Sequence, residues 1–309
     1  MKKELALCSL ALNPQAPSPT ASMVRINEGR MESFGGTFCI SIPVSVEVGC
    51  CFDPTVVSTF FRKERKFVSY TLHKNKLILQ EGKEKLSVAF LLPEEMPILD
   101  VLSKPVAVEF DMTFFKVAAD VVNPSHHKLS CQGVQFRQGM LFSGDGHIVV
   151  AAVTDFPDDL VFNLPVASAK ALLRFSSKVV SIGLDSHAVK FYFDDGSSLT
   201  SLLICEEFLN VNALFDGEWD SLKLTEDLAK DLLSISCDKV IFYKGNAIYT
   251  KGASEGQLTN CCEKTLDFIV NKTNLDTLLK VSSDIHINAD NNRLMVVSDL
   301  CRVISVTTK

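Results

Sequence analysis

Between Phe162 and Phe208 the spacing of apolar residues changes from a helical to a strand-like pattern. Pro165 suits the first position of a helix. The apolar residues behind it recur at steps of three and four, as on one helix face: Val166, Ala169, Leu172 and Leu173. Three alternating or continuous apolar runs follow, separated by turn residues: Val179–Leu184, Val189–Phe193 and Leu199–Ile204. The stretch predicts one short helix followed by three strands, and it contains no recognisable catalytic motif.

The same pattern occurs three times along the chain. The first cycle predicts helices over residues 1–12 and Asp53–Lys63, a hairpin over Met23–Met31, a strand over Phe38–Val48, and strands over Phe67–Leu72, Lys76–Gln80 and Leu86–Leu91. The second predicts a helix over Glu109–Val122 and a hairpin over Gly133–Phe142, and continues into the stretch above. The third predicts helices over Thr225–Ile235 and Asn274–Val281, a hairpin over Val240–Tyr249, a strand near Lys264–Val270 and final strands to the C-terminus.

Two unrelated landmarks give the same repeat length. In the hairpins, Gly139 lies 110 residues after Gly29, and Gly245 lies 106 residues after Gly139. The second helix of each cycle ends in an apolar pair followed by a base: Phe60-Phe61-Arg62, Leu172-Leu173-Arg174 and Leu278-Leu279-Lys280, spaced by 112 and 106 residues. The agreement predicts three copies of a unit of about 105 residues.

Each unit places two helices against one side of an antiparallel sheet, which is an α+β arrangement. We expect three domains, over residues 1–102, 103–216 and 217–309, joined near Asp100–Lys104 and Leu214–Asp220. Three domains also suit the length of 309 residues.

Composition excludes several classes of function. The net charge is −6, so a protein that simply coats nucleic acid is excluded, and any nucleic-acid contact must use local basic patches. The ten cysteines are scattered, and most lie in apolar runs (Cys39, Cys131, Cys205, Cys301), which favours buried reduced thiols of a cytosolic protein. The pairs Cys50-Cys51 and Cys261-Cys262 lack the spacing that brings two thiolates to one zinc ion.

No targeting or membrane segment is expected. The N-terminal apolar run is short, is interrupted by Glu4, and precedes no small-residue cleavage site. No segment approaches the ~18 apolar residues of a membrane span. We expect a cytoplasmic protein.

The base after each apolar pair recurs at one position in all three copies. Such a residue lies roughly 150° from the centre of the apolar helix face, so Arg62, Arg174 and Lys280 should point away from the sheet. Each could be an ordinary solvated residue. If the units form a ring with the helices inside, however, these positions form a basic lining that contacts phosphates without reading bases. The predicted DNA-contacting residues are Arg62, Lys66, Lys116, Lys170, Arg174, Lys178, Lys230 and Lys280.

This three-fold unit resembles the bacterial DNA polymerase III beta subunit, the sliding clamp, and especially its phage-encoded relatives. The likeness covers nearly the whole chain. It is clearest in the GDGHIVV run at Gly144–Val150, which is similar to the family's T-D-G-H-R-L segment, and in FDDGSSLTSLLICEEFLNV, which is similar to the segment that closes a clamp domain.

The resemblance implies a head-to-tail homodimer with six domains around duplex DNA. It also implies a groove in which the polymerase and a clamp-loader ATPase dock short apolar peptides. The groove residues that it implies are Gly144, Gly146, His147, Val149, Leu209, Leu214, Ile304 and Val306. Three family residues differ here: Gly144 replaces a threonine, Ile148 an arginine and Leu209 a proline, so the groove should be more apolar and select a different peptide.

Two other interpretations remain open. A D-G-H turn such as Asp145–His147 is often only a hairpin turn, and although Asp145 and His147 could do acid–base chemistry, no nucleophile in a recognisable motif lies nearby. A hydrolase is therefore a minor alternative, and we expect no enzyme activity, cofactor or metal. The leading prediction is a processivity factor that encircles duplex DNA. The alternative is a clamp-shaped monomer that acts as a decoy and sequesters replication partners.

Overall fold

The computed structural model describes residues 1–63, 65, 67–206, 208, 211–215, 218–243, 246–259, 268–288, 293–298 and 301–307. By contacts these residues form two compact units: Met1–Phe110 with Leu164–Cys205, and Asp111–Asn163 with Glu206–Lys309. The three expected domain ranges remain a prediction. Gly245, Lys66, Leu209, residues 264–267 and the Cys261-Cys262 pair lie outside the described residues.

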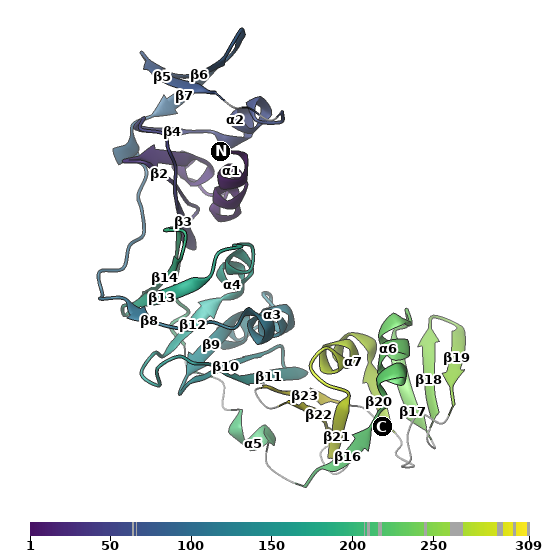
Figure 1. Ribbon diagram of the computed structural model, residues 1–309. Helices are drawn as coiled ribbons and strands as arrows, with labels where there is room; N and C mark the ends of the chain where they lie inside the picture. The colour runs from purple at the N-terminus through teal and green to yellow at the C-terminus, as the bar shows by residue number, and fades with distance from the viewer. Residues whose placement is uncertain are drawn as a thin grey trace. The chain divides into compact units, whose positions relative to one another are not determined.

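The order of elements repeats three times along the chain, as the apolar pattern predicted (Figure 1). The first copy contains α1 (Lys2–Cys8), β1 (Val24–Asn27), β2 (Arg30–Phe34), β3 (Phe38–Pro43), β4 (Cys50–Phe52), α2 (Pro54–Phe60), β5 (Ser69–His73), β6 (Lys76–Glu81) and β7 (Glu84–Leu91). The second contains β8 (Val106–Ala107), α3 (Met112–Val121), β9 (Gly133–Arg137), β10 (Met140–Gly144), β11 (Ile148–Val153), β12 (Phe162–Pro165), α4 (Val166–Leu172), β13 (Val179–Leu184), β14 (Ala188–Phe193) and β15 (Ser198–Leu202).

A short helix, α5 (Asn212–Phe215), precedes the third copy. That copy contains β16 (Asp220–Lys223), α6 (Glu226–Ser234), β17 (Lys239–Tyr243), β18 (Asn246–Lys251), β19 (Ser254–Leu258), β20 (Phe268–Asn271), α7 (Lys272–Leu279), β21 (Asp284–Asn288), β22 (Arg293–Val297) and β23 (Cys301–Val306).

Several predicted boundaries were wrong, for local reasons. The strand expected over Phe38–Val48 ends at Pro43, because Val44 N–H turns back to donate to the Gly29 carbonyl oxygen (2.8 Å). Pro165 is not the first helical residue: it ends β12 and caps α4, which begins at Val166. The helices expected from Glu109 and Asn274 begin instead at Met112 and Lys272, because the side chains of Asp111 and Asn271 cap them.

The hairpin turns explain why the repeat was visible in the sequence. Gly29 has φ +71 and follows Glu28 at φ +49, and Gly139 has φ +64 and follows Gln138 at φ +51. Two successive residues with positive φ are required by the two-residue hairpin turn that suits strand twist, and glycine adopts this conformation without steric cost. In both copies the glycine carbonyl then accepts a hydrogen bond from the residue 15 positions later, Val44 or Thr154.

The first unit is built on an eleven-stranded sheet, in the order β5-β6-β7-β4-β1-β2-β3-β15-β14-β13-β8. Helices α1, α2 and α4 lie on one side of it (Figure 1). The buried Leu5 and Cys8 of α1 pack on this side, and Ser201 Oγ of β15 donates to Ser168 Oγ of α4 (2.7 Å). The β3–β15 ladder makes one sheet from the first and second copies.

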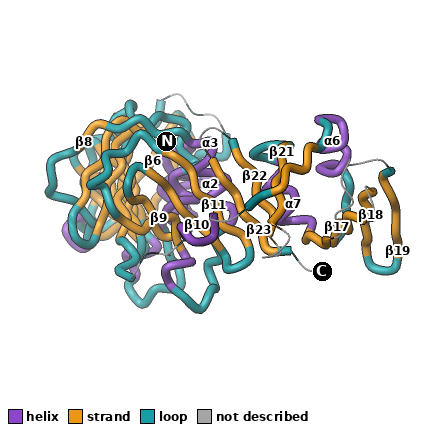
Figure 2. The backbone as a smooth tube through the Cα atoms, turned by 90° about the horizontal axis from the view of Figure 1, so that it is seen from below, coloured by secondary structure: helices purple, strands orange, loops and turns teal. Residues whose placement is uncertain are grey.

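The second unit contains an eight-stranded sheet, in the order β12-β9-β10-β11-β23-β22-β21-β16, and a four-stranded sheet, β19-β18-β17-β20. The β11–β23 ladder joins the second and third copies as β3–β15 joins the first and second, and β10, β11 and β23 lie side by side in Figure 2. Helices α3 and α7 pack on one face of the larger sheet, and α5 lies on the opposite side (Figure 1). The aromatic core contains Phe115, Phe136, Phe156 and Phe162.

Candidate functional site

The turn between β10 and β11 belongs to the peptide groove that the family resemblance implies, and side-chain hydrogen bonds fix its backbone. Asp145 Oδ1 accepts hydrogen bonds from the backbone N–H groups of His147 and Ile148, both at 2.8 Å. Gly146 has φ +90, a conformation that side chains disfavour, and a Cβ at this position would lie 3.3 Å from His126 Nε2. The His147 side chain is exposed at the tip of this turn. Asp145 is thus occupied in holding the turn.

An apolar surface adjoins this turn on the sheet face opposite α3. Val149 of β11 packs with Leu214 of α5 in a cluster whose buried members are Phe142, Ala151 and Val211, and whose partly exposed members also include Met140 and Phe215. We call this cluster, together with Ile304, the apolar groove. Ile304 lies directly opposite Val149 in the β11–β23 ladder, and Gly144 lies opposite Val149 in the β10–β11 ladder.

The structure thus brings together four of the predicted groove residues, Gly144, Val149, Leu214 and Ile304, with Gly146 and His147 at the adjoining turn. Leu209 and the side chain of Val306 lie outside the described residues. Val149 and Ile304 are direct cross-strand partners, and such partners lie on the same face of a sheet.

Three further residues shape this groove, and no pattern in the sequence pointed to them. The guanidinium of Arg137 lies 4.8 Å from the ring centroid of Phe142 and 5.7 Å from that of Phe208, and burial lowers the pKa of Arg137. Arg293 Nη1 donates to the Leu214 carbonyl oxygen, and Trp219 Nε1 to that of Phe215, each at 3.3 Å. These contacts hold α5 on the sheet. The Arg293–Leu214 and Arg137–Phe208 contacts join residues far apart in the sequence, and the three residues have no motif in common.

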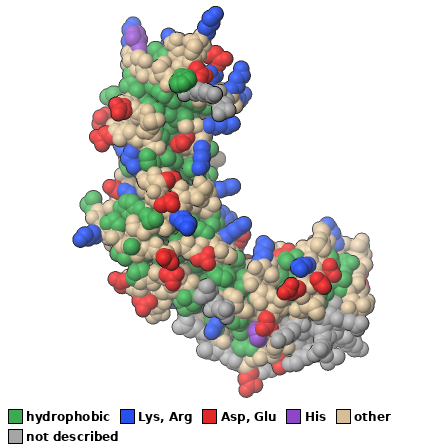
Figure 3. Space-filling model, viewed as in Figure 1, with side chains coloured by type: hydrophobic (Ala, Val, Ile, Leu, Met, Phe, Trp, Pro, Cys, Tyr) green, Lys and Arg blue, Asp and Glu red, His purple; other side chains and the backbone are tan. Residues whose placement is uncertain are grey.

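The predicted basic residues of the first unit lie on the side of its helices. Arg62, Lys170, Arg174 and Lys178 are exposed, and none forms an ion pair with a described residue. Helices α1, α2 and α4 contain one acidic residue, Glu4, which pairs with the Met1 amino group. Figure 3 shows Lys and Arg side chains projecting from this side. The first unit therefore presents a positive helix layer within an acidic chain.

The position of these bases differs in one respect from the prediction. Helix α2 ends at Phe60 and α4 at Leu172, so Arg62 and Arg174 lie in the turns just after their helices, while Lys280 is the C-cap of α7. All three side chains are exposed, as predicted. A cation near a helix C-terminus also interacts favourably with the helix dipole.

The second unit presents a weaker positive surface. Lys116 of α3 is exposed, but α6 has the sequence EDLAKDLLS, and its Lys230 lies 3.9 Å from Glu226 with 72% and 86% of the two side chains exposed. Such an exposed pair contributes little to stability. Lys272 of α7 is buried and pairs with Asp276. Among the described residues of α6 and α7 and the turn after them, Lys280 is therefore the one exposed cation without an acidic partner.

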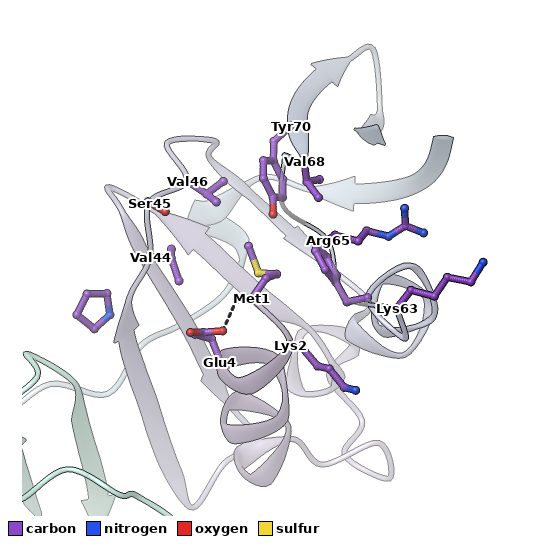
Figure 4. A pocket seen from close by; sticks show the side chains of 12 residues that line it. Met1, Lys2, Glu4, Val44, Ser45, Val46, Lys63, Arg65, Val68 and Tyr70 are labelled. Carbon is purple, nitrogen blue, oxygen red and sulfur yellow. Dashed lines mark ion pairs between the residues drawn. The ribbon is translucent and has the colours of Figure 1, made fainter. Parts of the chain in front are cut away.

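A separate cavity of about 640 Å³ opens in the first unit beside the start of α1 (Figure 4). Most of its charged lining is paired: Met1 with Glu4, Lys63 with Glu84 (4.0 Å), and Arg65 with Glu81 (3.0 Å) and Glu84, whereas Lys2 forms no ion pair with a described residue. Burial raises the pKa of Tyr70 to about 12, so the phenol stays protonated. The described lining residues include no histidine and no nucleophile beside a base, so this cavity offers no catalytic arrangement.

The described cysteines are free thiols, and six of the eight are buried: Cys8, Cys39, Cys50, Cys51, Cys131 and Cys301. This confirms the predicted burial of those residues. The prediction was wrong for Cys205, which is exposed because β15 ends at Leu202. Among described residues, no group of three or more His, Cys, Asp or Glu side chains is placed to hold a metal ion.

No helix in the described part of the chain is both long and apolar enough to cross a membrane.

No protein-family model and no curated protein matches the sequence. Solved structures match the fold. The Helicobacter pylori beta clamp bound to a DNA ligase peptide has a TM-score of 0.82 at 13% identity, covering 100% of this chain and 97% of that chain. The Bacillus subtilis DNA polymerase sliding clamp has 0.82 at 11%, covering 100% and 96%. A putative DNA polymerase III beta subunit from Eubacterium rectale has 0.83 at 12%, covering 99% and 96%. The chain therefore has the fold of the bacterial beta sliding clamp, as the sequence resemblance predicted.

Proposed function

We propose that this chain, whose fold is that of the bacterial beta sliding clamp, is a processivity factor that encircles duplex DNA and tethers a replicative polymerase. The observation that carries the proposal is the match to beta clamps over the whole chain, rather than over one repeat. The protein acts by shape and binding, without enzyme activity, cofactor or metal. It works in the cytoplasm of a bacterial or virus-infected cell, and the divergent groove favours a phage origin.

Weak, sequence-independent contacts to phosphates suit this function. The exposed bases of the first unit, with Lys116 and Lys280 of the second, supply positive charge without a base-reading motif. A closed ring is retained by topology, so it does not need the tight grip that a basic coating protein requires. The overall net charge of −6 is compatible with this mode of binding.

Two open strand edges support a head-to-tail dimer. Strand β7 pairs with β6 along its length but with β4 only through Phe90 and Leu91, so its other edge from Glu84 to Ala89 has no described neighbour. Among described residues, β19 pairs with β18 alone. In the repeat, β7 corresponds to β15 and β23, and β19 corresponds to β3 and β11. These are the strands that join copies within the chain.

A third in-register ladder of the same kind would therefore pair β19 of one protomer with β7 of its partner. Two such ladders close a dimer into a six-domain ring. Exposed edges that are left unpaired are a hazard for aggregation, and pairing them removes it.

The apolar groove is the proposed docking site for partner peptides. The Helicobacter pylori clamp was solved with a DNA ligase peptide bound. In this chain the partly exposed Met140, Val149, Leu214 and Phe215 give an apolar patch bordered by Arg137 and Arg293, which fits a short apolar segment. The polymerase and a loader ATPase are the proposed partners.

The molecular mass in solution tests the ring against a monomeric decoy. We expect light scattering to give twice the chain mass of 34.0 kDa at micromolar concentration. Ser87→Pro in β7 and Gln257→Pro in β19 should each reduce it to the monomer, because proline cannot donate to a ladder. Leu72→Pro in β5 is the matched control, because the Leu72 N–H also faces an open edge, at the opposite side of the β5–β6–β7 sheet, and this variant should stay dimeric. A wild-type protein that remains at 34 kDa with and without duplex DNA would contradict the ring.

A further inference from the structure

A second cavity lies in the first unit where β3 and β15 join the first two copies. Its volume is about 320 Å³. The strand residues that line it are direct cross-strand partners, so they share one sheet face, and it is the face opposite Ser201 and α4. The lining comprises Arg30, Glu32, Cys39, Ser41, Lys190, Tyr192, Gly196, Ser198 and Thr200, with Ile98, Leu99 and Asp100 of the connecting loop.

This cavity occupies the position of the apolar groove in the repeat. The residues of β2 and β3 that line it lie 110 positions before the corresponding groove residues of β10 and β11. In the β3–β15 ladder Thr200 lies opposite Cys39, and in the β11–β23 ladder Ile304 lies opposite Val149. The replacements are Arg30 for Met140, Glu32 for Phe142, Cys39 for Val149, Ser41 for Ala151 and Thr200 for Ile304. The same place in the fold is therefore polar at one junction and apolar at the other, so the two cavities must suit different ligands.

Arg30 is held rigidly but keeps donor capacity. Its Nε donates to Ser41 Oγ (2.7 Å), and its Nη2 donates to the carbonyl oxygens of Gly196 (3.0 Å) and Ser41 (3.2 Å). Its Nη1 has no described hydrogen-bond partner. Glu32 does not neutralise Arg30, because Glu32 Oε2 accepts from Arg25 and Oε1 accepts from Ser41 Oγ (3.0 Å).

Lys190 is the second cation of the cavity, and its counterion is on a loop. Lys190 Nζ lies 2.6 Å from Asp100 Oδ1, and the Lys190 side chain is only 19% exposed, whereas that of Asp100 is 56% exposed. Burial works against the ionised form of Asp100, but the hydrogen bonds from Lys190 and from Val101 N–H lower its pKa overall. The Asp100 carboxylate thus pairs with Lys190, which is held in the sheet, while most of the Asp100 side chain remains exposed to solvent.

We propose that this polar cavity is a second docking site, and that it binds an acidic side chain of a partner polypeptide. The incoming carboxylate replaces that of Asp100 on Lys190 and accepts from Nη1 of Arg30. A carboxylate is the group that suits a guanidinium and an ammonium lining one cavity. The Asp100 side chain acts as an internal competitor for this site. The inference does not depend on DNA encirclement, since it concerns one junction within a single chain.

The experiment uses the full-length protein and a fluorescein-labelled, end-capped pentapeptide, Gly-Glu-Leu-Glu-Gly, with Gly-Gln-Leu-Gln-Gly as the neutral match. We expect Asp100→Asn to bind the acidic peptide roughly tenfold more tightly than the wild type, because the internal competitor is lost while an acceptor for Val101 N–H remains. The double variant Asp100→Asn with Lys190→Gln should lose this gain. Asp159→Asn, an exposed acid outside the cavity, should leave the affinity unchanged.

A Val149→Asp variant separates this site from the apolar groove, and it should bind the acidic peptide as the wild type does. Three results would overturn the proposal. The affinity for the acidic peptide could fail to rise in Asp100→Asn, or it could stay raised when Lys190 is also replaced. The neutral peptide could also bind as tightly as the acidic one. Thermal unfolding of each variant shows whether it is folded, so that a lower peptide affinity in the double variant is not mistaken for an effect of unfolding.

Discussion

Val149 and Ile304 are 155 residues apart in the chain, yet they face each other in the ladder that joins β11 to β23. Leu214 of α5 packs against Val149 from outside this sheet. Three segments far apart in sequence therefore form one apolar surface, and a change at its centre should affect peptide binding without dismantling any single copy.

Val149→Asp should weaken peptide binding at least tenfold, because a carboxylate in the groove loses its hydration when an apolar peptide covers it. The measurement is fluorescence anisotropy with a labelled short apolar peptide that the wild type binds, tested first with the DNA ligase peptide bound by the Helicobacter pylori clamp. Val180→Asp, at an exposed strand position of the first unit, is the matched control and should bind normally. If the two variants bind the peptide with equal affinity, Val149 is not part of the peptide-binding site.

Gly146→Ala should lower the midpoint of thermal unfolding more than Gly36→Ala does. Both glycines have positive φ, +90 and +106, so each substitution costs about 1–2 kcal/mol of backbone strain. Only at Gly146 would the new Cβ also approach another group, His126 Nε2 at 3.3 Å, whereas nothing lies within 4 Å at Gly36. If the two variants melt at the same temperature, the new Cβ does not crowd His126 enough to affect stability.

Replacing Lys170 and Arg174 by Gln should weaken duplex binding at low salt. The slope of log affinity against log salt should fall by roughly 0.9 for each phosphate that the variant no longer neutralises. Lys76 and Lys83, exposed on the β6–β7 hairpin, provide a control with the same change of charge. An equal weakening in the control pair would show that net charge alone, rather than the helix layer, governs DNA binding.

Stability should fall as the pH rises above about 9. Burial raises the pKa of Cys39, Cys50 and Cys301 from the ordinary 9.0 to about 12. Between these values the unfolded thiols release protons that the folded ones retain, so each contributes a loss of up to about 1.4 kcal/mol per pH unit. Thermal unfolding between pH 8 and 10 measures this, and Cys301→Ala should show a shallower fall. A midpoint independent of pH over this range would contradict the burial of these thiols.

The parts of the fold that could be predicted from the sequence are those fixed by nearby residues. The turns at Gly29 and Gly139 need positive φ, and the apolar pairs at the ends of the second helices must face a sheet, so both recur at one period. The ladders β3–β15 and β11–β23 could not be predicted from patterns alone, because strand pairing across 100 residues or more has no local signal. The groove residues were found only through the family resemblance.

The positions of the helices were predicted better than the net charge of their surfaces. The basic residue after each apolar pair is exposed in all three copies, but Lys230 has Glu226 beside it, and α6 also contains Asp227 and Asp231. A count of lysines at helical spacing overlooks such neighbours. The polar cavity with Arg30 and Lys190 could not be predicted from the sequence, because its lining comes from strands and a loop that are far apart in the chain.

The central claim is encirclement, and the most direct measurement is retention on a linear duplex whose ends can be blocked. The protein is mixed with a biotin-ended duplex, and streptavidin is added either before or after mixing. The complex is then separated by gel filtration at moderate salt. A ring that threads over free ends should be retained when the blocks are added second, excluded when they are added first, and released when a restriction enzyme cuts the duplex. Equal retention in both orders of addition would contradict the account.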